Sequence, residues 1–438
     1  MSRQRPIRPI AAIGLASVIA LAGCGGDSDK AATTTAAPAS NVSGSLTIVG
    51  VWTGDEQKSF QAVLDGFTAK NPKVEVKYTS AGDNVSTVLG TAVQGGSPPD
   101  LASIAQPGLI KDFHAKHALK PLDFADADVS ANYSTDIAKL GTIGGKLYSF
   151  VFKAANKSTV WYNVAAFKSA GVKPPADWGT FLANAKTLKA SGVPAYSLGG
   201  ADGWTLTDLF ENVYLRQAGA QKYDALTDHE IKWTDASVKT ALRTMADVLG
   251  DTQNIAGGKA GALQTDFPGS VAKVFVNPAK AAQVIEGDFV PGAAAKTKLE
   301  PKTGYDVFPF PSIGAAKNVV VGGGDSIVMF KDKPAARALV KYLASPTAAG
   351  IWAKRGGYSS ANKNLLPSAY PDEITRTTAT AIAKAGTFRF DLSDLEPASF
   401  GGTPGQGEWK ILQDFLSNPG DVDATASALE QAAAKAFK

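Results

Sequence analysis

Residues 45–52 and 55–72 read SLTIVGVW and DEQKSFQAVLDGFTAKNP, and together they predict a strand followed by a helix. The first stretch is a short, continuous run of mainly apolar residues, which is typical of a buried strand. In the second, Phe60, Val63, Leu64 and Phe67 recur at the spacing of one helix face before Pro72 ends the helix. A buried strand leading into an amphipathic helix is the repeating unit of α/β folds.

The same alternation continues along most of the chain. Further strands are expected at 73–78, 99–105, 159–163, 194–200, 281–285, 305–311 and 318–330, with helices at 85–96, 108–120, 178–192, 206–219 and 237–250. After about residue 333 the pattern is almost wholly helical. Strands that alternate with helices imply a mainly parallel sheet, and ligands of such folds bind beyond the carboxyl ends of the strands.

The first 23 residues have the features of a secretory signal. Arg3, Arg5 and Arg8 precede an apolar run that is too short to span a bilayer. Residues 21–24, LAGC, resemble the lipobox of bacterial lipoproteins, which implies cleavage before Cys24 and lipidation of its sulfur. An ordinary signal peptide with an unused cysteine is the alternative. We expect a protein anchored to the cell membrane by lipid alone, on its extracytoplasmic face.

The composition beyond the signal suits a tethered, two-core protein. Residues 24–44 are mainly small and polar and predict a flexible tether. Loss of residues 1–23 lowers the formal net charge from +4 to +1, and no basic cluster remains that would indicate nucleic-acid binding. The remaining length is sufficient for two hydrophobic cores of ordinary size.

An ordered series of motifs at the strand-to-helix turns resembles the extracellular solute-binding proteins of ABC importers, in the branch of maltose- and glucose-binding proteins. The motifs are VWTGDEQKSFQAVLDGF (51–67), GGSPPDLASIAQPGLI (95–110), VFKAANKSTVWYNVAAFKSAGV (151–172), WTLTDLFENVYL (204–215), AAQVIEGDFVPG (281–292), VVGGGDSIVMFKD (320–332), KYLASPTAAGIWAKRGGYSS (341–360) and GTPGQGEWKILQDF (402–415).

The resemblance implies an α/β, two-lobed, type II periplasmic-binding-protein-like fold with a ligand cleft between the lobes and three hinge crossovers. The implied lobes are 45–153 plus 324–357 and 154–323 plus 358–438. The crossovers are expected near Ala154, Gly323 and Gly357, where the glycines suit a hinge or simply end strands. A monomer that closes over its ligand and delivers it to ABC permease subunits is the implied mechanism.

Aromatic residues at the turns are candidates for stacking on a sugar ring. Trp52 ends the first strand, Trp204 opens a helix, and Trp409 lies in a turn. Phe289 stands where relatives often carry a stacking Trp, and this departure puts stacking there in doubt. Trp204 and Trp409 could instead be aromatics that pack helices together.

Carboxylates and amides suit sugar hydroxyls, and polar candidates lie at several turns. These candidates are Asp55, Glu56, Asp83, Gln106, Lys153, Asn156, Asp288 and Asp325. Asp83, Gln106, Lys153 and Asn156 occupy loop positions that contact ligand in the family, whereas Asp288 and Asp325 each follow an apolar strand, where an unpaired carboxylate would be costly. Asp55 and Glu56 could equally be first-turn residues that the helix dipole favours. Asp83 and Lys153 could be solvated surface residues. Trp52 and Asp288 are expected to contact one ligand from opposite walls, exposed when the cleft is open.

Two other classes of function compete with sugar binding. The chain lacks the nucleophile-elbow, phosphate-loop and zinc-protease motifs, although its acids would permit an extracellular glycosidase. Its acids and aromatics could also enclose a cation such as a polyamine or an amino sugar. His114 and His117 lack a third ligand nearby. The sequence therefore favours a lipid-anchored receptor for a neutral mono- or oligosaccharide, with no catalysis, metal or cofactor.

Overall fold

The computed structural model describes residues 42–294, 297–382 and 384–438. The chain divides into Met1–Ala39 and Ser40–Lys438, and only the second unit is considered below. The predicted signal peptide, Cys24 and nearly all of the predicted tether lie outside the described residues. The last residue of that tether, Gly44, is the first residue of strand β1 (Gly44–Gly50).

The first sheet begins with the predicted strand–helix units. β1, β2 (Val74–Ser80) and β3 (Leu101–Ile104) are parallel neighbours. They alternate with the helices α1 (Gly54–Thr68), α2 (Val85–Gln94) and α3 (Pro107–Ala115). The side chains Phe60, Val63, Leu64 and Phe67 of α1 are all buried, which confirms the helix face read from the sequence.

Long strands from later in the chain complete this sheet. β6 (Ser149–Asn156) and β11 (Val319–Met329) pair antiparallel to each other, and β11 is also antiparallel to β3. β12 (Thr387–Phe390) pairs parallel with the first residues of β11. The sheet is therefore mixed: the pairings of β1 with β2, β1 with β3 and β11 with β12 are parallel, as the prediction of a mainly parallel sheet requires, whereas β11 pairs antiparallel with β3 and β6. The nearly all-helical prediction after residue 333 missed β12.

The second sheet has the order β10-β7-β9-β8. Its strands are β7 (Thr159–Asn163), β8 (Tyr196–Ser197), β9 (Gln283–Ile285) and β10 (Tyr305–Pro309). Only β8 and β9 of these neighbours are parallel. The helices that accompany it include α6 (Val164–Ala170), α7 (Trp178–Ala190), α8 (Trp204–Thr227), α9 (Ala236–Leu249), α10 (Gly258–Ala262) and α11 (Phe267–Val274).

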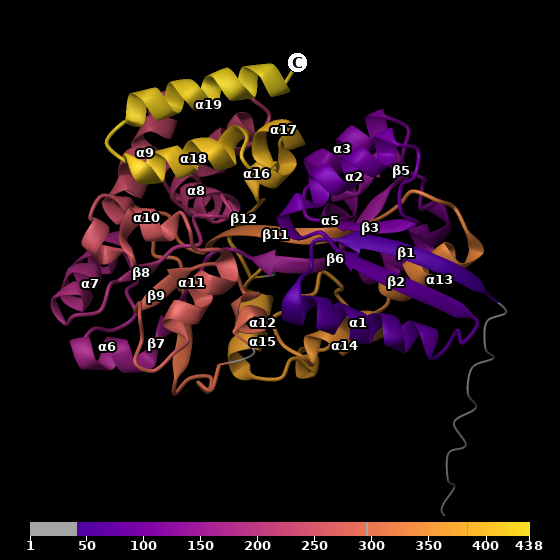
Figure 1. Cartoon of the computed structure of the whole chain (residues 1–438), viewed down its shortest axis with the longest axis horizontal. Helices are drawn as coiled ribbons and strands as arrows, with labels where there is room; N and C mark the ends of the chain where they lie inside the picture. Colours follow the sequence, from indigo (N-terminus) through magenta and orange to yellow (C-terminus); the bar gives the residue numbers. More distant parts are fainter. Residues whose placement is uncertain (1–41, 295–296, 383) are drawn as a thin grey trace, which may run out of the picture. The chain divides into compact units, whose positions relative to one another are not determined.

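The remaining elements are shorter strands and helices, and Figure 1 labels most of them. A hairpin is formed by β4 (Thr142–Ile143) and β5 (Lys146–Leu147). The helices are α4 (Asp126–Asn132), α5 (Thr135–Leu140), α12 (Val290–Ala293), α13 (Pro334–Leu343), α14 (Pro346–Ala353), α15 (Glu373–Ala381), α16 (Leu392–Leu395), α17 (Ala398–Gly401), α18 (Gly407–Ser417) and α19 (Val422–Ala436). Single 3₁₀ turns are η1 (Gly82–Asn84), η2 (Asp123–Ala125), η3 (Thr252–Asn254) and η4 (Pro367–Ala369).

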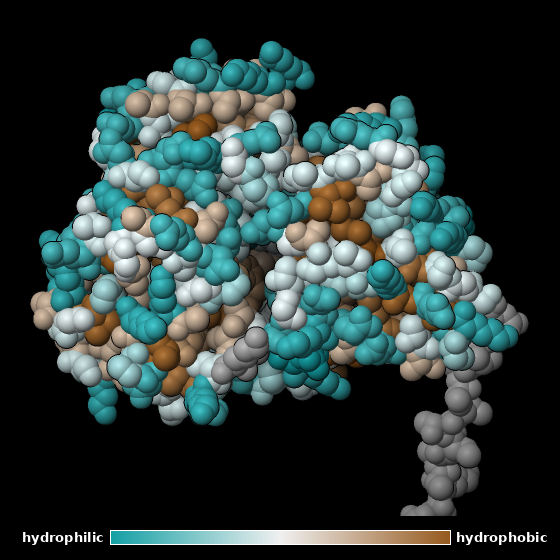
Figure 2. Space-filling model, in the orientation of Figure 1, coloured by the Kyte–Doolittle hydropathy of each residue, from teal (hydrophilic) through white to brown (hydrophobic). Residues whose placement is uncertain are grey.

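Each sheet has its own hydrophobic cores, and this defines two lobes. In lobe 1 the cores surround the first sheet, and in lobe 2 they surround the second. β11 connects the lobes, because Val321 lies in a lobe 2 core whereas Ile327 and Met329 lie in a lobe 1 core. Hydrophobic residues occur only in small groups on the face shown in Figure 2. No helix among the described residues is long and apolar enough to cross a membrane.

Candidate ligand pocket

A pocket of about 280 Å³ is lined by residues of both lobes. From lobe 1 come the residues after β1, the turn η1, the start of α3 and the strands β6 and β11. From lobe 2 come the starts of α8 and α11 and parts of α16 and α18. The pocket thus lies beyond the carboxyl ends of β1 and β3, among helix N-termini, as ligand sites of α/β folds do. Its volume is close to the lower end of the about 300–1,000 Å³ of ligand pockets, which favours a small ligand.

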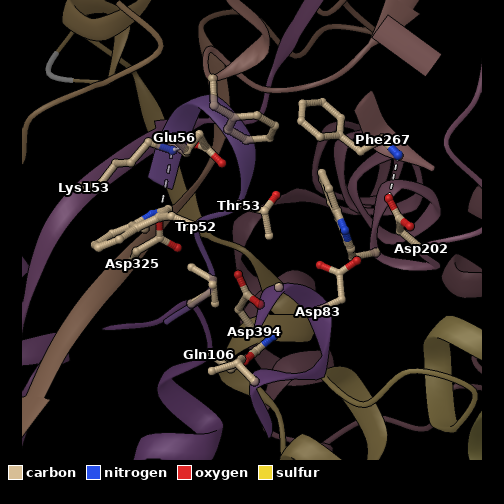
Figure 3. A pocket seen from close by; sticks show the side chains of 18 of the residues that line it. Trp52, Thr53, Glu56, Asp83, Gln106, Lys153, Asp202, Phe267, Asp325 and Asp394 are labelled. Carbon is tan, nitrogen blue, oxygen red and sulfur yellow. Dashed lines mark hydrogen bonds and ion pairs between the residues drawn. The ribbon is translucent and has the colours of Figure 1, made fainter. Parts of the chain in front are cut away.

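The structure brings most of the sequence-predicted candidates together in this pocket, and Figure 3 shows many of them. Nine line it, namely Trp52, Glu56, Asp83, Gln106, Lys153, Trp204, Phe289, Asp325 and Trp409. Asp55, Asn156 and Asp288 do not. Further lining residues that the sequence reading did not single out include Thr53, Lys157, Asp202, Asp266, Phe267 and Asp394.

The three candidates that do not line the pocket make hydrogen bonds to other parts of the chain. Asp55 accepts a hydrogen bond from Lys58 at 2.6 Å on the outside of α1. Asn156 accepts from the backbone N–H of Ser158 and donates to the carbonyl oxygen of Thr378. Asp288 is buried and accepts from the Ser359 hydroxyl, so it connects two segments of the chain instead of facing the pocket. Burial raises the pKa of Asp288 to about 6.

One end of the pocket holds one ammonium, that of Lys153, beside two carboxylates. Lys153 and Asp325 are opposite each other in the β6–β11 register. The Lys153 ammonium donates to Glu56 at 2.8 Å and lies 3.9 Å from Asp325. Burial by itself would lower the pKa of Lys153, but the charges of Glu56 and Asp325 outweigh it and raise that pKa. Lys153 therefore remains an ammonium that is already paired before any ligand arrives.

Trp52 connects this charged group to the core of lobe 1. Its indole N–H donates to Asp325 at 2.6 Å, and its ring centroid lies 4.4 Å from that of Phe60 and 4.9 Å from that of Trp352. Only 1% of Trp52 is exposed. The expectation that Trp52 is exposed in the ligand-free protein is therefore not met in this structure, because one side of its ring is part of an aromatic core.

Three aromatic side chains form a wall of the pocket on the lobe 2 side. The ring centroids of Trp204, Phe267 and Phe289 lie 5.3 to 5.9 Å from one another. Trp204 and Phe289 are only partly buried. Aromatic faces of this kind can cover the C–H surface of a sugar ring. The wall includes Phe289, the position where the sequence departs from the pattern of relatives.

The other end of the pocket carries three carboxylates, Asp83 of lobe 1 and Asp202 and Asp266 of lobe 2, and Figure 3 shows Asp83 and Asp202 on the same side. Asp202 accepts from the backbone N–H of Phe267 at 2.6 Å, and Asp266 caps α11. The surrounding protein disfavours the charged form of Asp83 and Asp202 repels a second negative charge, which together raise the pKa of Asp83 to about 7 although the residue is exposed to solvent. Among the described lining residues, both lysines are already paired with other acids.

Two polar atoms of the pocket wall have no partner among the described residues. They are Oε1 of Gln106 and Nε1–H of Trp409, on side chains that are 6% and 2% exposed. One can only accept and the other only donate a hydrogen bond. A buried polar atom without a partner costs about 1–3 kcal/mol. Both atoms are inaccessible in this structure, so water or a ligand can reach them only when neighbouring side chains move. Gln106 comes from α3 and Trp409 from α18, so the two lobes each contribute one.

Behind the pocket floor lies a group of buried acids around one lysine. Lys157 contacts Asp391, donates to Asp208 at 3.0 Å and lies 3.7 Å from Asp394, which lines the pocket. Burial by itself would lower the pKa of Lys157, but the charges of the neighbouring acids outweigh it and raise that pKa well above its usual value. Burial raises the pKa of Asp208 to about 7. The local excess of acids over this lysine means that some of them hold a proton at neutral pH.

The lining residues that were not predicted from the sequence have no distinctive sequence pattern around them. Asp202 and Asp266 stand just before helices α8 and α11, where an acid is common simply as a helix cap. Asp394 and Lys157 depend on how α16 packs against the β6–β7 connection, which no local pattern reports. Nowhere in the described part of the chain could three or more His, Cys, Asp or Glu side chains hold a metal ion.

Comparison with known proteins finds sequence matches over most of this chain. The sequence pattern of bacterial extracellular solute-binding proteins matches residues 52–350. The osmoprotective compounds-binding protein GgtB of Synechocystis sp. is 33% identical over 388 residues, which are 87% of this chain and 90% of that protein. The alpha-glucosides-binding periplasmic protein AglE of Rhizobium meliloti is 32% identical over 395 residues, which are 87% of this chain and 85% of that protein.

A solved structure shows the same fold. The bacterial solute receptor AcbH, described as preferring β-D-galactopyranose, superposes with a TM-score of 0.78 at 18% sequence identity. The match covers 90% of this chain and 99% of AcbH. At this identity the similarity establishes the two-lobed type II fold and no more.

Trp52→Ala should lower the free energy of unfolding of the ligand-free protein by about 3–5 kcal/mol, because it leaves a cavity among packed rings and removes a donor from Asp325. Urea unfolding of the ligand-free chain measures this. Trp52→Phe is the matched control and should cost less, since it keeps most of the ring volume. An unfolding free energy within 1 kcal/mol of the unchanged chain for Trp52→Ala would show that the ring is not part of the core.

Stability should fall as the pH rises from about 5 to 8. Burial raises the pKa of Glu286, Glu396 and Glu408 well above the usual value, so these acids hold protons in the folded chain that the unfolded chain has lost. Each such group removes roughly 1.4 kcal/mol per pH unit between its unfolded and folded pKa values. Urea unfolding at several pH values measures the slope.

Glu408→Gln is the matched control for this pH dependence, because it keeps the shape and removes one titrating group. Between pH 5 and 8 the unfolding free energy of Glu408→Gln should fall less steeply with pH than that of the unchanged chain. Burial would raise the pKa of Asp391, but the ammonium of Lys157 outweighs burial and lowers that pKa. The stabilisation that Asp391 adds to the folded chain is therefore lost only below about pH 4. Stability that increases with pH over the range 5 to 8 would contradict the protonated state of these acids.

Proposed function

Because the chain belongs to the family of bacterial extracellular solute-binding proteins, we propose that its pocket captures a small neutral mono- or oligosaccharide for an ABC importer. Substrate-binding proteins of such importers bind carbohydrate and work with permease subunits. The family and the named relatives bind solutes and do not transform them, so the chain is a binding protein and not an enzyme. The glycosidase alternative is therefore set aside.

The observation that carries the proposal is the pair of unpartnered atoms in the pocket wall. A ligand that satisfies both Gln106 Oε1 and Trp409 Nε1–H must itself donate and accept hydrogen bonds. Sugar hydroxyls do both, whereas a fully protonated polyamine can only donate. The aromatic wall of Trp204, Phe267 and Phe289 supplies the apolar surface that a sugar ring also needs. The two full-length relatives, whose names specify alpha-glucosides and osmoprotective compounds, support a small polar ligand.

An amino sugar is the second candidate, and a specific observation favours it. Asp83, Asp202 and Asp266 lie at one end of the pocket beside aromatic rings, and an ammonium group there would gain both ion pairing and cation–π attraction. A sugar carrying one amine would still satisfy Gln106 and Trp409 through its hydroxyls. Charge on the ligand is therefore the property that separates the two candidates.

Capture is proposed to proceed by closure of the two lobes about the crossovers near Ala154, Gly323 and Gly357, with the lobe boundaries given above. β6 and β11 support this, since Ala154 and Gly323 lie in these strands that join the lobes. Gly357 has a φ of +62°, and a Cβ there would lie 2.7 Å from the backbone nitrogen of Gly292. Glycine at 357 therefore permits both an unusual conformation and a close approach.

Calorimetric titration of the chain with methyl α-D-glucopyranoside, maltose, D-galactose and D-glucosamine tests the proposal. At least one neutral sugar should bind, and its affinity should change little between 50 and 500 mM NaCl, whereas that of a cationic sugar should fall. Trp409→Phe removes the N–H together with part of the indole ring and should weaken binding by about tenfold. Absence of binding by all four sugars, or an unchanged affinity in Trp409→Phe, would contradict the proposed contacts.

Attachment to the membrane is proposed to depend on lipidated Cys24, followed by the tether of residues 24–44. Cys24→Ser removes the sulfur that would carry the lipid and should release the protein from the membrane fraction, or stall it as the precursor. Membrane fractionation and lipid labelling of the producing cells measure this. A Cys24→Ser chain that is still labelled and membrane-bound would exclude this anchor.

A further inference from the structure

The N-terminal half of α3 in lobe 1 contacts a short segment of lobe 2. This segment, residues 396–402, contains α17, and Figure 1 shows α16 and α17 beside α3. Ala398 belongs to the same hydrophobic core as Leu109 and Ile110 of α3. Its backbone N–H donates a hydrogen bond to Asp112. We call this the α3–α17 contact, and it joins the lobes away from the crossover strands β6 and β11.

Two glycines, one from each lobe, permit the α3–α17 contact. A Cβ at Gly108 would lie 1.7 Å from the carbonyl oxygen of Glu396, which is far inside van der Waals distance. A Cβ at Gly402 would lie 2.9 Å from Cγ of Gln106. Neither glycine has a positive φ, so close approach and not backbone conformation explains them. A side chain at either position would push the two segments apart.

The α3–α17 contact is coupled to the pocket through Gln106. Gln106 lines the pocket, and its side chain also packs on Gly402 of the other lobe. Trp409, the other residue with an unpartnered polar atom, follows the same lobe 2 segment at the start of α18. When the contact is formed, both unpartnered atoms are brought to one pocket. When it is broken, Gln106 loses the neighbour that fixes it.

We propose that the α3–α17 contact forms when the lobes close on the ligand and opens when they separate, so that Gly108 and Gly402 are positioning residues for ligand binding. This inference rests on the proposed function. A residue that adds stability only to the closed form raises affinity without touching the ligand, because the apparent dissociation constant is the intrinsic one divided by the fraction of closed protein. Blocking the contact should therefore weaken binding and leave the open protein folded.

Hydrogen–deuterium exchange with and without the most tightly bound of the test sugars probes the contact. Bound sugar should slow exchange of the amides of residues 396–402 in the unchanged chain, and Gly108→Ala should remove this protection, because the added Cβ excludes Glu396 from α3. Exchange in β1 and β7 should be unchanged, and the melting temperature should stay within about 2 °C of the unchanged chain. Gly402→Ala is a milder second variant from the other lobe and should act in the same direction.

Gly90→Ala in the neighbouring helix α2 is the matched control, because a Cβ at Gly90 meets nothing within 4 Å. It should leave exchange at residues 396–402 unchanged. Equal exchange there with and without sugar in the unchanged chain, or sugar protection that persists in Gly108→Ala, would show that the contact does not form on closure. Faster exchange in β1 and β7 together with a lower melting temperature would show that the contact is a permanent part of the fold. Either result overturns the proposal.

The effect on binding is measured with whichever of methyl α-D-glucopyranoside, maltose and D-galactose binds the unchanged chain most tightly. Gly108→Ala should lower the affinity for that sugar by about tenfold or more, and Gly90→Ala should leave the affinity unchanged. Equal affinity in the unchanged chain and Gly108→Ala would overturn the role in binding. If none of the three sugars binds the unchanged chain, the proposed function is what fails. If a sugar binds the unchanged chain and Gly108→Ala equally well, the proposed function stands and only the role of the contact is overturned.

Discussion

The antiparallel pairing of β6 with β11 is the interaction on which the rest of this structure depends. It joins the lobes, because residues near one end of β11 lie in a lobe 2 core and residues near the other end lie in a lobe 1 core. Its register also places Lys153 opposite Asp325, so one set of backbone hydrogen bonds fixes both the interlobe connection and the charged end of the pocket. A change in this register would disturb the fold and the site together.

At one end of the pocket the polar side chains pair with one another without a ligand, whereas elsewhere in its wall two polar atoms have no partner. At the end near Trp52, the indole, Lys153, Glu56 and Asp325 satisfy one another, which makes that end a rigid wall. Gln106 and Trp409 instead present one acceptor and one donor that nothing else in the described chain uses. This difference separates residues that shape the site from residues that bind, and it explains why Trp52 is better understood as part of the wall.

The sequence predicted the positions of the pocket better than the directions of its side chains. The βα pattern located Trp52, because strand ends and helix starts meet at one edge of a sheet. The family resemblance located Gln106, and Asp325 lines the pocket from within β11 and not from its end. Asp288 also follows a strand, but its carboxylate turns to the Ser359 hydroxyl, a choice set by a segment 71 residues away. Asp202 and Asp394 lacked a distinctive local pattern. The direction of β11 was missed for the same reason, since a buried strand reads alike in parallel and antiparallel sheets.

A crystal structure of the chain with a bound sugar is the most direct test of the central claim, that a carbohydrate is held between the lobes by groups left unpartnered without it. We expect sugar hydroxyls within about 3.2 Å of both Gln106 Oε1 and Trp409 Nε1, with a sugar ring against the wall of Trp204, Phe267 and Phe289. A sugar bound elsewhere, or one that leaves both atoms unpartnered, would contradict this claim.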